Sequence, residues 1–361
     1  MIKNINWSIV GGGNGGQSMA GHLGVKGFPV KLFDVNEEVV KKINEKGGID
    51  VSGIVEGFGK VQMATTNIRE VIEDADFIIV VLPSLYHKDI AKACAPHLKD
   101  GQIVLLHPGS TFGALEFKKT LMEENCKADV TIGEVNSLLY ACRVTEPGKA
   151  HIFGIKNYLF AAALPATENK RMLEVLNTAF PQFREAKNVI HTSLENFNAM
   201  MHPAPTLLNT SKIDSKEDFL YYHEGITPVI GEYIEKMDKE RILIGKALDI
   251  DIIPMKKWYV DMYDSTGETL SELCKNTKAY NGIIGQKTLM TRYVLEDIPY
   301  SLEAMMSMGK MVGVNVDRME TIVNLGKSIL GDDLLSDKRT MSALGFSDFS
   351  KEELLNYVEN L

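Results

Sequence analysis

The segment 196–210 carries a single histidine, His202, among polar side chains that recur at helical spacing. At about 100° per residue, one narrow helix face carries Asn198, His202, Thr206 and Asn209. Burying such a stripe without partners costs free energy, so it must find partners or face a cavity. Pro203 and Pro205 each remove a backbone donor and predict a kink beside the histidine. A histidine there suits proton transfer near neutral pH, and the plain alternative is a core histidine bonded to a carbonyl.

A second candidate segment runs from Arg292 to Pro299. The Arg292 guanidinium could hold a carboxylate through two parallel hydrogen bonds, and its plain alternative is a surface ion pair. Asp297 stands just before a proline that is expected to open a helix, so it could simply cap that helix. The two roles are compatible, because an ionised carboxylate at a helix start can also orient an imidazole.

A glycine loop follows the first apolar run, residues 5–10, and precedes a helix-like stretch over 17–26. Its residues are Gly11, Gly12, Gly13, Asn14, Gly15 and Gly16. The first, third and sixth positions fit the G-x-G-x-x-G spacing of dinucleotide sites, where the glycines permit a tight turn and close approach of a pyrophosphate. The phosphates would lie on free N–H groups at the helix start. We expect Gly11, Gly13, Asn14, Gly15 and Gly16 to contact the cofactor.

The next predicted strand, residues 28–34, ends at Asp34, whose carboxylate could accept both hydroxyls of the adenosine ribose. No arginine follows it to receive a 2′-phosphate, so the sequence predicts NAD, with NADP less favoured. The plain alternative is that Asp34 caps the helix that begins near Glu37. Pro83 ends a later strand and is expected near the nicotinamide ribose. Weaker candidates for the pocket also follow predicted strands, namely His107, Glu134, Asn136 and Arg143.

The first half of the chain alternates strands with helices, which predicts a doubly wound, mainly parallel α/β sheet of the Rossmann type. Strand-like runs fall at 5–10, 28–34, 77–82, 103–107 and 129–133, and helix-like segments at 15–26, 36–46, 67–73, 87–95 and 113–124. Residues 50–65 predict a small β excursion, and 150–154 and 157–163 are expected to finish the sheet. Helical periodicity dominates later, as over 228–248 and 304–330. We therefore expect a dinucleotide-binding domain over 1–187 and a mainly α-helical substrate domain over 188–361.

Composition narrows the function. The chain has 361 residues and a net charge of −9, which offers no field for nucleic acid or acidic membrane. No apolar run approaches the ~20 residues of a membrane span, and no signal peptide precedes the first strand. The 4 cysteines are scattered without a C-x-x-C pair, so we expect reduced thiols, a cytoplasmic protein and no metal site. Small-molecule substrates are the expected partners, and a homodimer is the candidate assembly.

Three motifs together resemble the opine dehydrogenases of the octopine/nopaline type. They are the glycine loop Gly11–Gly16, the His-Pro-x-Pro of His202 with Asn209 downstream, and Arg-Tyr-x-x-Glu-Asp-x-Pro over Arg292–Pro299. Residues 222–228 and 238–241 also resemble that family. The resemblance implies a reductive condensation of an amino acid with a 2-oxo acid, often pyruvate, through an imine. It implies that His202 and Asp297 form the catalytic pair and that Arg292 binds a carboxylate. From their positions in the sequence, Asn198 on the polar stripe and Glu134 after a strand are expected as further substrate contacts.

The sequence departs from the family pattern after Gly285, where Gln286 stands in place of an expected proline, and after Pro299, where Tyr300 follows in place of a glycine. Both changes affect the pocket outline and hence the amino acid accepted. Four aromatic residues could line this pocket or simply be core side chains: Trp258, Tyr259, Tyr263 and Tyr280.

Two other functions are compatible with parts of this sequence. A reductase of a simple 2-oxo or 3-hydroxy acid, similar to ketopantoate reductase, would have the same two-domain plan but generally uses a lysine on the first helix after the nucleotide domain. No lysine lies between Lys187 and Lys212, which favours the opine reaction. A non-catalytic nucleotide sensor is the third possibility, and the His, Arg and Asp set argues against it.

Overall fold

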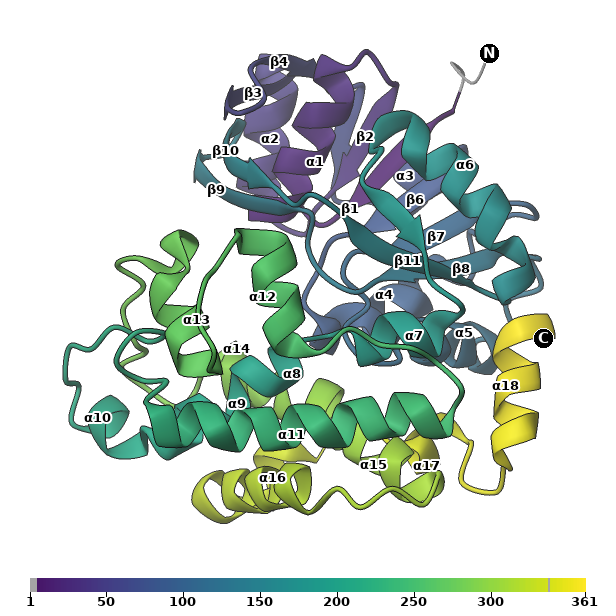
Figure 1. Ribbon diagram of the computed structural model, residues 1–361. Coiled ribbons are helices and arrows are strands. Elements are labelled where there is room, and N and C mark those ends of the chain that lie inside the picture. The colour runs from purple at the N-terminus through teal and green to yellow at the C-terminus, as the bar shows by residue number, and fades with distance from the viewer. Residues whose placement is uncertain (1–4, 337) are drawn as a thin grey trace. The chain divides into compact units, whose positions relative to one another are not determined.

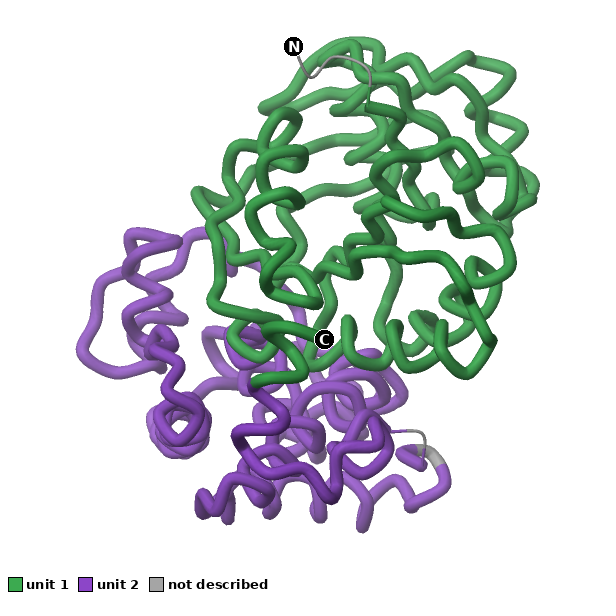
Figure 2. Tube along the Cα trace, turned by 90° about the vertical axis from the view of Figure 1, so that its right-hand side faces the viewer, with its two compact units in different colours: residues 1–193, 356–361 green, residues 194–355 purple. Residues whose placement is uncertain are grey.

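The computed structural model describes residues 5–336 and 338–361, and these form two compact units (Figure 2). Unit 1 extends to Ser193 and includes 356–361, and unit 2 comprises Leu194–Leu355. The first unit thus continues past the predicted boundary at 187/188. The reason is local: the hydroxyls of Thr192 and Ser193 donate to the Glu134 carboxylate at 2.6 and 2.7 Å, which ties them to the sheet.

Unit 1 contains an eight-stranded sheet that confirms the predicted doubly wound fold (Figure 1). Its order is β12 (Phe183–Glu185), β11 (Leu159–Leu164), β8 (Thr131–Val135), β7 (Ile103–Leu106), β6 (Phe77–Val80), β1 (Trp7–Val10), β2 (Val30–Phe33) and β5 (Met63–Thr65). From β8 to β5 the strands are parallel, and β11 is antiparallel to β8. Every residue of β1, β6 and β7 is buried, as expected for strands with both faces covered.

The first five helices of unit 1 lie at the predicted places, and two further helices, α6 and α7, follow them along the chain. They are α1 (Asn14–Val25), α2 (Glu37–Lys46), α3 (Ile68–Ile72), α4 (His87–Cys94), α5 (Gly113–Glu123), α6 (Asn169–Ala179) and α7 (Val189–Leu194). Local chemistry sets their ends. The Asn36 side chain accepts from the N–H groups of Glu38 and Val39 at the start of α2, and Gly47 ends that helix with φ +76°.

A second, four-stranded sheet corrects one expectation. Its order is β4 (Gly57–Lys60), β3 (Gly48–Gly53), β10 (Lys149–Ile155) and β9 (Tyr140–Glu146). The run 150–154 was expected to finish the main sheet, but it lies in β10, parallel to β3 and antiparallel to β9. Ala150 and Ile152 are buried while Phe153 is exposed, which is the alternation of a sheet with one covered face. The excursion predicted over 50–65 is confirmed as part of β3, β4 and β5.

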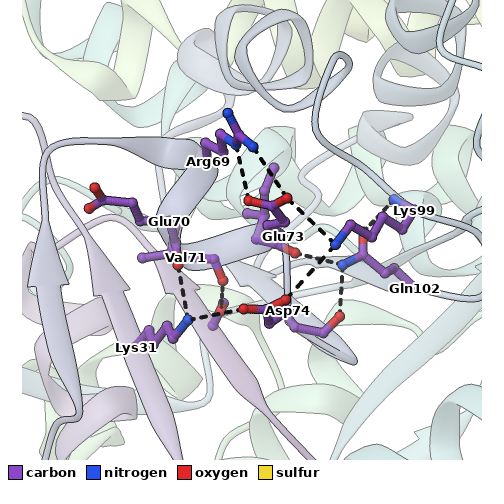
Figure 3. A network of polar contacts seen from close by, with 11 residues as sticks. Lys31, Arg69, Glu70, Val71, Glu73, Asp74, Lys99 and Gln102 are labelled. Atoms are coloured by element: carbon purple, nitrogen blue, oxygen red, sulfur yellow. Dashed lines mark hydrogen bonds and ion pairs between the residues drawn. The ribbon is translucent and has the colours of Figure 1, made fainter.

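A network of hydrogen bonds and ion pairs connects the segments at the amino ends of the main strands (Figure 3). The Gln102 amide, just before β7, donates to the carbonyls of Ile72 and Ala75 at 2.6 and 2.7 Å. Around it lie surface ion pairs, including Arg69 with Glu73 at 3.0 Å. Such exposed pairs contribute little stability, whereas the buried amide satisfies two carbonyls. The glycine loop lies at the opposite, carboxyl ends of the strands.

Unit 2 is helical, as predicted (Figure 1). Its helices are α8 (Asn198–Met201), α9 (Pro203–Leu208), α10 (Thr210–Asp214), α11 (Pro228–Ala247), α12 (Met255–Tyr263), α13 (Leu270–Asn276), α14 (Arg292–Leu295), α15 (Glu303–Met311), α16 (Asp317–Leu330), α17 (Met341–Leu344) and α18 (Lys351–Asn360), whose last residues belong to unit 1. The periodicity over 304–330 divides between α15 and α16, separated near Gly313 with φ +73°. Among the described helices, none combines the length and the apolar character needed to cross a bilayer.

A buried arginine organises the long helix α11. The Arg241 guanidinium donates to Asp238 Oδ1 at 2.8 Å, to the Leu194 carbonyl at 2.7 Å and to the Ile253 carbonyl. It therefore joins α11 to the segment before α8 and to the loop before α12. Because its charge is compensated by these acceptors, the arginine can be fully buried.

Because of His22 in unit 1, we expect the free energy of unfolding to decrease at acidic pH. It is buried, with Nδ1 2.8 Å from the Tyr140 hydroxyl, and burial, together with nearby Lys26, lowers the pKa of its imidazole from 6.5 to about 4. Between these values the unfolded chain binds the proton and the folded chain does not, so stability falls as the pH drops through this range. From pH 7 to pH 5 we expect His22 to remove on the order of 2 kcal/mol from the free energy of unfolding.

Urea unfolding of the wild type and of His22→Gln at both pH values measures this contribution. The glutamine amide can still bond to the Tyr140 hydroxyl, and all other titrating groups are shared. The variant should lose less stability on acidification than the wild type does. An identical loss in both proteins would contradict the assignment to His22.

Candidate active site

The glycine loop in unit 1 has the backbone that its sequence predicts. Gly11 adopts φ +111°, and a Cβ there would lie 2.6 Å from the Val81 carbonyl oxygen. A Cβ on Gly16 would lie 1.7 Å from the Gly11 carbonyl oxygen, so the helix could not pack so closely on the strand end. Gly13 differs, because no atom lies within 4 Å of its Cβ position. The loop is thus packed against the rest of unit 1 at Gly11 and Gly16, and there is open space beside Gly13.

The start of α1 offers free donors beside this opening. Gly13 is the N-cap residue of the 12-residue helix, no side chain caps it, and its first turn has no acidic residue. Unbonded N–H groups at a helix start bind phosphate. The Asn14 Oδ1 accepts from the Val144 N–H at 2.8 Å, which fixes the side chain and directs its amide oxygen, an acceptor, to β9. Gly15 is packed against Val81. These two residues can therefore contribute backbone groups.

Asp34 lies directly after β2, next to the loop. Its Oδ2 accepts from the Gly12 N–H and its Oδ1 accepts from the Asn36 N–H at 2.8 Å. The helix α2 is capped by Asn36, so the alternative that Asp34 caps this helix is wrong. The half-buried carboxylate is held at the carboxyl end of β2, where the ribose of a dinucleotide is expected.

The other predicted residues of unit 1 have varied environments. Pro83 follows β6 and has φ −56° and ψ 148°. A short 3₁₀ turn, Ser84–Tyr86, begins directly after it. Glu134 on β8 is fully buried; in addition to Thr192 and Ser193 it accepts from the Ala114 N–H at 2.8 Å. These contacts are those of a structural residue, and a substrate contact for Glu134 stays a prediction.

The weaker candidates also have defined contacts. The Asn136 amide accepts from the Phe160 N–H at 3.0 Å and so joins β8 to β11. Arg143 is exposed on β9. His107 is completely buried, and burial, with a smaller effect of Lys156, lowers its pKa to about 3. A neutral, enclosed imidazole of this kind is a packing residue.

His202 in unit 2 lies at a break in the chain between α8 and α9, with φ −104° and ψ −56°. This confirms the kink predicted from the two prolines. Pro205 has no N–H for the Met201 carbonyl, and the Tyr221 hydroxyl lies 3.2 Å from that oxygen and 3.0 Å from the His202 carbonyl oxygen. The break is therefore stabilised by a side chain that replaces the missing backbone donor.

The imidazole of His202 meets the carboxylate of Asp297. His202 Nδ1 lies 2.7 Å from Asp297 Oδ2, and the two side chains are only 7% and 4% exposed. Asp297 makes no capping bond to the π-helical turn Ile298–Leu302 that it precedes, so the capping alternative does not describe it. His202 Nε2 has no hydrogen-bond partner in the part of the chain that the structure describes. One nitrogen is thus held and the other is available.

The remaining polar residues of the stripe have other roles. The Thr206 hydroxyl is 2.9 Å from the Tyr221 hydroxyl. The Asn209 amide donates to the carbonyls of Pro205 and Gly225 at 2.8 and 2.9 Å, so both residues stabilise the segment. Asn198 begins α8 and is half-buried.

Arg292 opens the short helix α14. Its side chain is 57% exposed, and its Nε lies 3.8 Å from Glu296 Oε2, which is an ion pair without a hydrogen bond. The guanidinium therefore keeps its donors for a carboxylate ligand, while the expected alternative of a surface ion pair also describes it.

Sequence reasoning gave no role to two features of this site. The ring of Tyr293 lies flat on the imidazole of His202, with centroids 3.7 Å apart and planes 4° apart. The Asn196 amide donates to the Ser301 hydroxyl at 3.0 Å, which joins the two segments a second time. Two sequence signals pointed to Tyr293: it is the tyrosine of the Arg-Tyr-x-x-Glu-Asp-x-Pro motif, and it stands four residues before Asp297, a spacing that puts both on one helix face.

The four candidate pocket aromatics form one cluster with Tyr222 and Phe197. Tyr280 stacks on Tyr222 at 3.8 Å, its hydroxyl is 3.1 Å from that of Tyr259, and Trp258 packs on Phe197 at 4.8 Å. Tyr263 packs against Trp258 and Tyr280. Burial raises the pKa of Tyr222, Tyr259 and Tyr280 well above 10, so these phenols stay neutral.

Comparisons with known proteins identify the family of this chain. Residues 185–330 match the family model described as the alpha-helical domain of NAD/NADP octopine/nopaline dehydrogenase, and residues 6–136 match the N-terminus of NAD-dependent glycerol-3-phosphate dehydrogenase. The opine dehydrogenase of Arthrobacter sp. (strain 1C) is 37% identical over 99% of this chain and 100% of its own length. The octopine dehydrogenase of Pecten maximus is 22% identical over 91% of each chain. A solved octopine dehydrogenase structure with NADH and L-arginine matches with a TM-score of 0.83 and 20% identity over 98% of both chains.

The different surroundings of Gly16 and Gly13 give a matched pair of variants. Gly16→Ala should destabilise unit 1 and abolish tight NADH binding, because its Cβ would overlap the Gly11 carbonyl. Gly13→Ala should keep the fold, with a stability loss of at most about 1 kcal/mol at an N-cap position, yet weaken NADH binding because the methyl group occupies the open side of the loop. Thermal unfolding and fluorescence titration with NADH measure both effects. Unchanged NADH affinity in Gly13→Ala would show that the pyrophosphate does not bind there.

Proposed function

We propose that this chain, which belongs to the opine dehydrogenase family, uses His202 and Asp297 for the proton transfers of its reaction. That reaction is the NAD-linked reductive condensation of an amino acid with a 2-oxo acid to an N-(1-carboxyalkyl) amino acid. The protein is therefore an oxidoreductase that acts on CH–NH bonds. The observation that supports the proposal is the buried His202–Asp297 hydrogen bond of 2.7 Å with Nε2 left unbonded among the described residues.

The substrate chemistry defines what the pair must do. The amine adds to the carbonyl of the 2-oxo acid to give a carbinolamine, which loses water and becomes an imine. When bound, NADH supplies the hydride that reduces the C=N bond. His202 Nε2 exchanges a proton with the carbinolamine oxygen or with the nitrogen, while Asp297 holds Nδ1 and compensates the charge of the imidazolium.

For the cofactor, we propose that the glycine loop and the two strand ends form the binding site. Gly11, Gly13 and Gly16 shape the loop, and the residues between them, Asn14 and Gly15, supply N–H groups at the start of α1. Asp34 would bind the adenosine ribose, and Pro83 would contact the nicotinamide ribose. The carboxylate of Asp34 would repel a 2′-phosphate, which supports NAD over NADP.

For the substrates, we propose that the 2-oxo acid is pyruvate and that the guanidinium of Arg292 binds its carboxylate. Its exposure and its long distance to Glu296 support this role. Asn198, half-buried at the start of α8, is a second proposed contact. A contact from Glu134 would require it to leave hydrogen bonds that it already makes, so Arg292 is the better supported anchor.

The cellular setting is also a proposal. The described cysteines Cys94, Cys126, Cys142 and Cys274 are all free thiols, which supports a reducing, cytoplasmic location and a place in amino acid metabolism. The homodimer expected from the sequence stays a prediction.

Replacing His202 tests the proposal. His202→Ala should lower kcat by about 10²–10⁴-fold, the usual contribution of general acid–base catalysis, while NADH affinity stays at the wild-type level. NADH oxidation, followed at saturating pyruvate across a panel of amino acids, measures kcat, and fluorescence titration measures affinity. His97→Ala is the matched control, because His97 lies between α4 and β7 in unit 1, whereas the glycine loop follows β1 and the His202–Asp297 pair belongs to unit 2.

Two outcomes would reject the proposal. Wild-type turnover in His202→Ala would remove this residue from the mechanism. NADH oxidation by the wild-type protein with the 2-oxo acid alone, at the same rate with and without amine, would favour the simple 2-oxo acid reductase instead.

A further inference from the structure

We propose that Tyr293 is a positioning residue that fixes the plane of the His202 imidazole and so aims Nε2 at the reacting atoms. This inference rests on the proposed role of His202 and adds a second restraint to the one that Asp297 provides. A hydrogen bond to Nδ1 sets the direction of the imidazole within its plane, but it allows the ring to tilt about the bond. A flat stack prevents that tilt.

The His202 and Tyr293 rings stack face to face in van der Waals contact. Carbon atoms in van der Waals contact are about 3.5–4.0 Å apart, so two centroids 3.7 Å apart with planes at 4° limit the lateral offset of the rings to about 1 Å. Two neutral aromatic rings prefer offset or edge-on packing. A cation over the face of a tyrosine ring is attracted to it, so the stack would also stabilise the imidazole when it becomes positively charged during proton exchange.

Both restraints on His202 come from one turn of the chain. Tyr293 lies in α14 and Asp297 follows four residues later, with the Glu296 and Asp297 N–H groups both bonded to the Arg292 carbonyl. Residues at this spacing share a helix face. Arg292 and Glu296, also four apart, pair with each other on a neighbouring face at 3.8 Å. The turn therefore presents a ring and a carboxylate to the same imidazole.

Tyr293 is itself held in place. Tyr221 packs edge-on against it, with centroids 5.3 Å apart at 65°, and the Tyr221 hydroxyl bonds to the His202 carbonyl at 3.0 Å. Burial raises the pKa of Tyr293, with an opposing contribution from a hydrogen bond with Tyr222, and raises the pKa of Tyr221 well above 10. Neutral, interlocked phenols thus surround the imidazole, and Asp297 supplies the charge.

Three variants separate the ring from its hydroxyl and from general packing. Tyr293→Leu removes the aromatic face, Tyr293→Phe keeps the face and removes the hydroxyl, and Phe160→Leu removes a different aromatic–histidine contact, with His191 in unit 1. The readouts are kcat, KM for both substrates, NADH affinity by fluorescence and the thermal unfolding midpoint. Tyr293→Met repeats the test if the leucine variant does not fold.

We expect Tyr293→Leu to lower kcat by about 10- to 100-fold with NADH affinity unchanged, as for a misaligned catalytic group. Tyr293→Phe should restore kcat nearly to wild type, and Phe160→Leu should leave kcat unchanged. The inference is overturned if Tyr293→Leu retains wild-type kcat, or if Tyr293→Phe is as slow as Tyr293→Leu. His202→Ala, measured in parallel, separates the two ideas: if that variant keeps full turnover, the proposed function of His202 has failed, whatever Tyr293 does.

Discussion

The structure of the helical unit depends on one buried hydrogen bond, between His202 and Asp297, which are 95 positions apart in the chain. A buried carboxylate and imidazole are tolerated only when each has a partner, so any displacement of either segment leaves a costly unpaired group. Two proline residues interrupt the helix at His202, and the Tyr221 hydroxyl replaces a donor that the interruption removes. The Asn196–Ser301 bond joins the same two segments a second time. The break in the helix at His202 therefore allows a single long-range hydrogen bond, that between His202 and Asp297.

The dinucleotide-binding unit obeys a different constraint, which is steric. Gly16 must approach the Gly11 carbonyl so closely that no side chain fits, and this contact brings the start of α1 to the end of β1. Free N–H groups and the positive end of the helix dipole then face the same opening at Gly13. Asp34 joins this opening to the next strand through the Gly12 N–H. The candidate site of unit 1 therefore depends on glycines, which have no side chain. The candidate site of unit 2 depends on two buried polar side chains, His202 and Asp297.

Local sequence patterns predicted the features that depend on neighbouring residues, namely the strands, the helices and the glycine loop of unit 1. Apolar runs and caps placed the strands and helices of unit 1, and the glycine spacing placed the loop. Pairing between distant segments was harder to predict: the run in β10 is apolar enough for the main sheet, but its alternation suits the second sheet beside β3. Glu134 looked like a pocket residue because it follows a strand, yet Ala114, Thr192 and Ser193 occupy its carboxylate. The stack of Tyr293 on His202 depends on how two segments pack, which no spacing within either segment reveals.

A double-mutant cycle on the catalytic pair tests the account most directly. The kcat/KM values of His202→Gln, Asp297→Asn and the double variant would be compared with wild type under saturating NADH. If the two side chains act as one proton-transfer unit, the double variant should be about as slow as His202→Gln alone, because removing the orienting carboxylate has no effect once the imidazole is gone. Losses that multiply, with the double variant slower than either single variant by the full factor of the other, would show that the two groups act independently and would contradict the account.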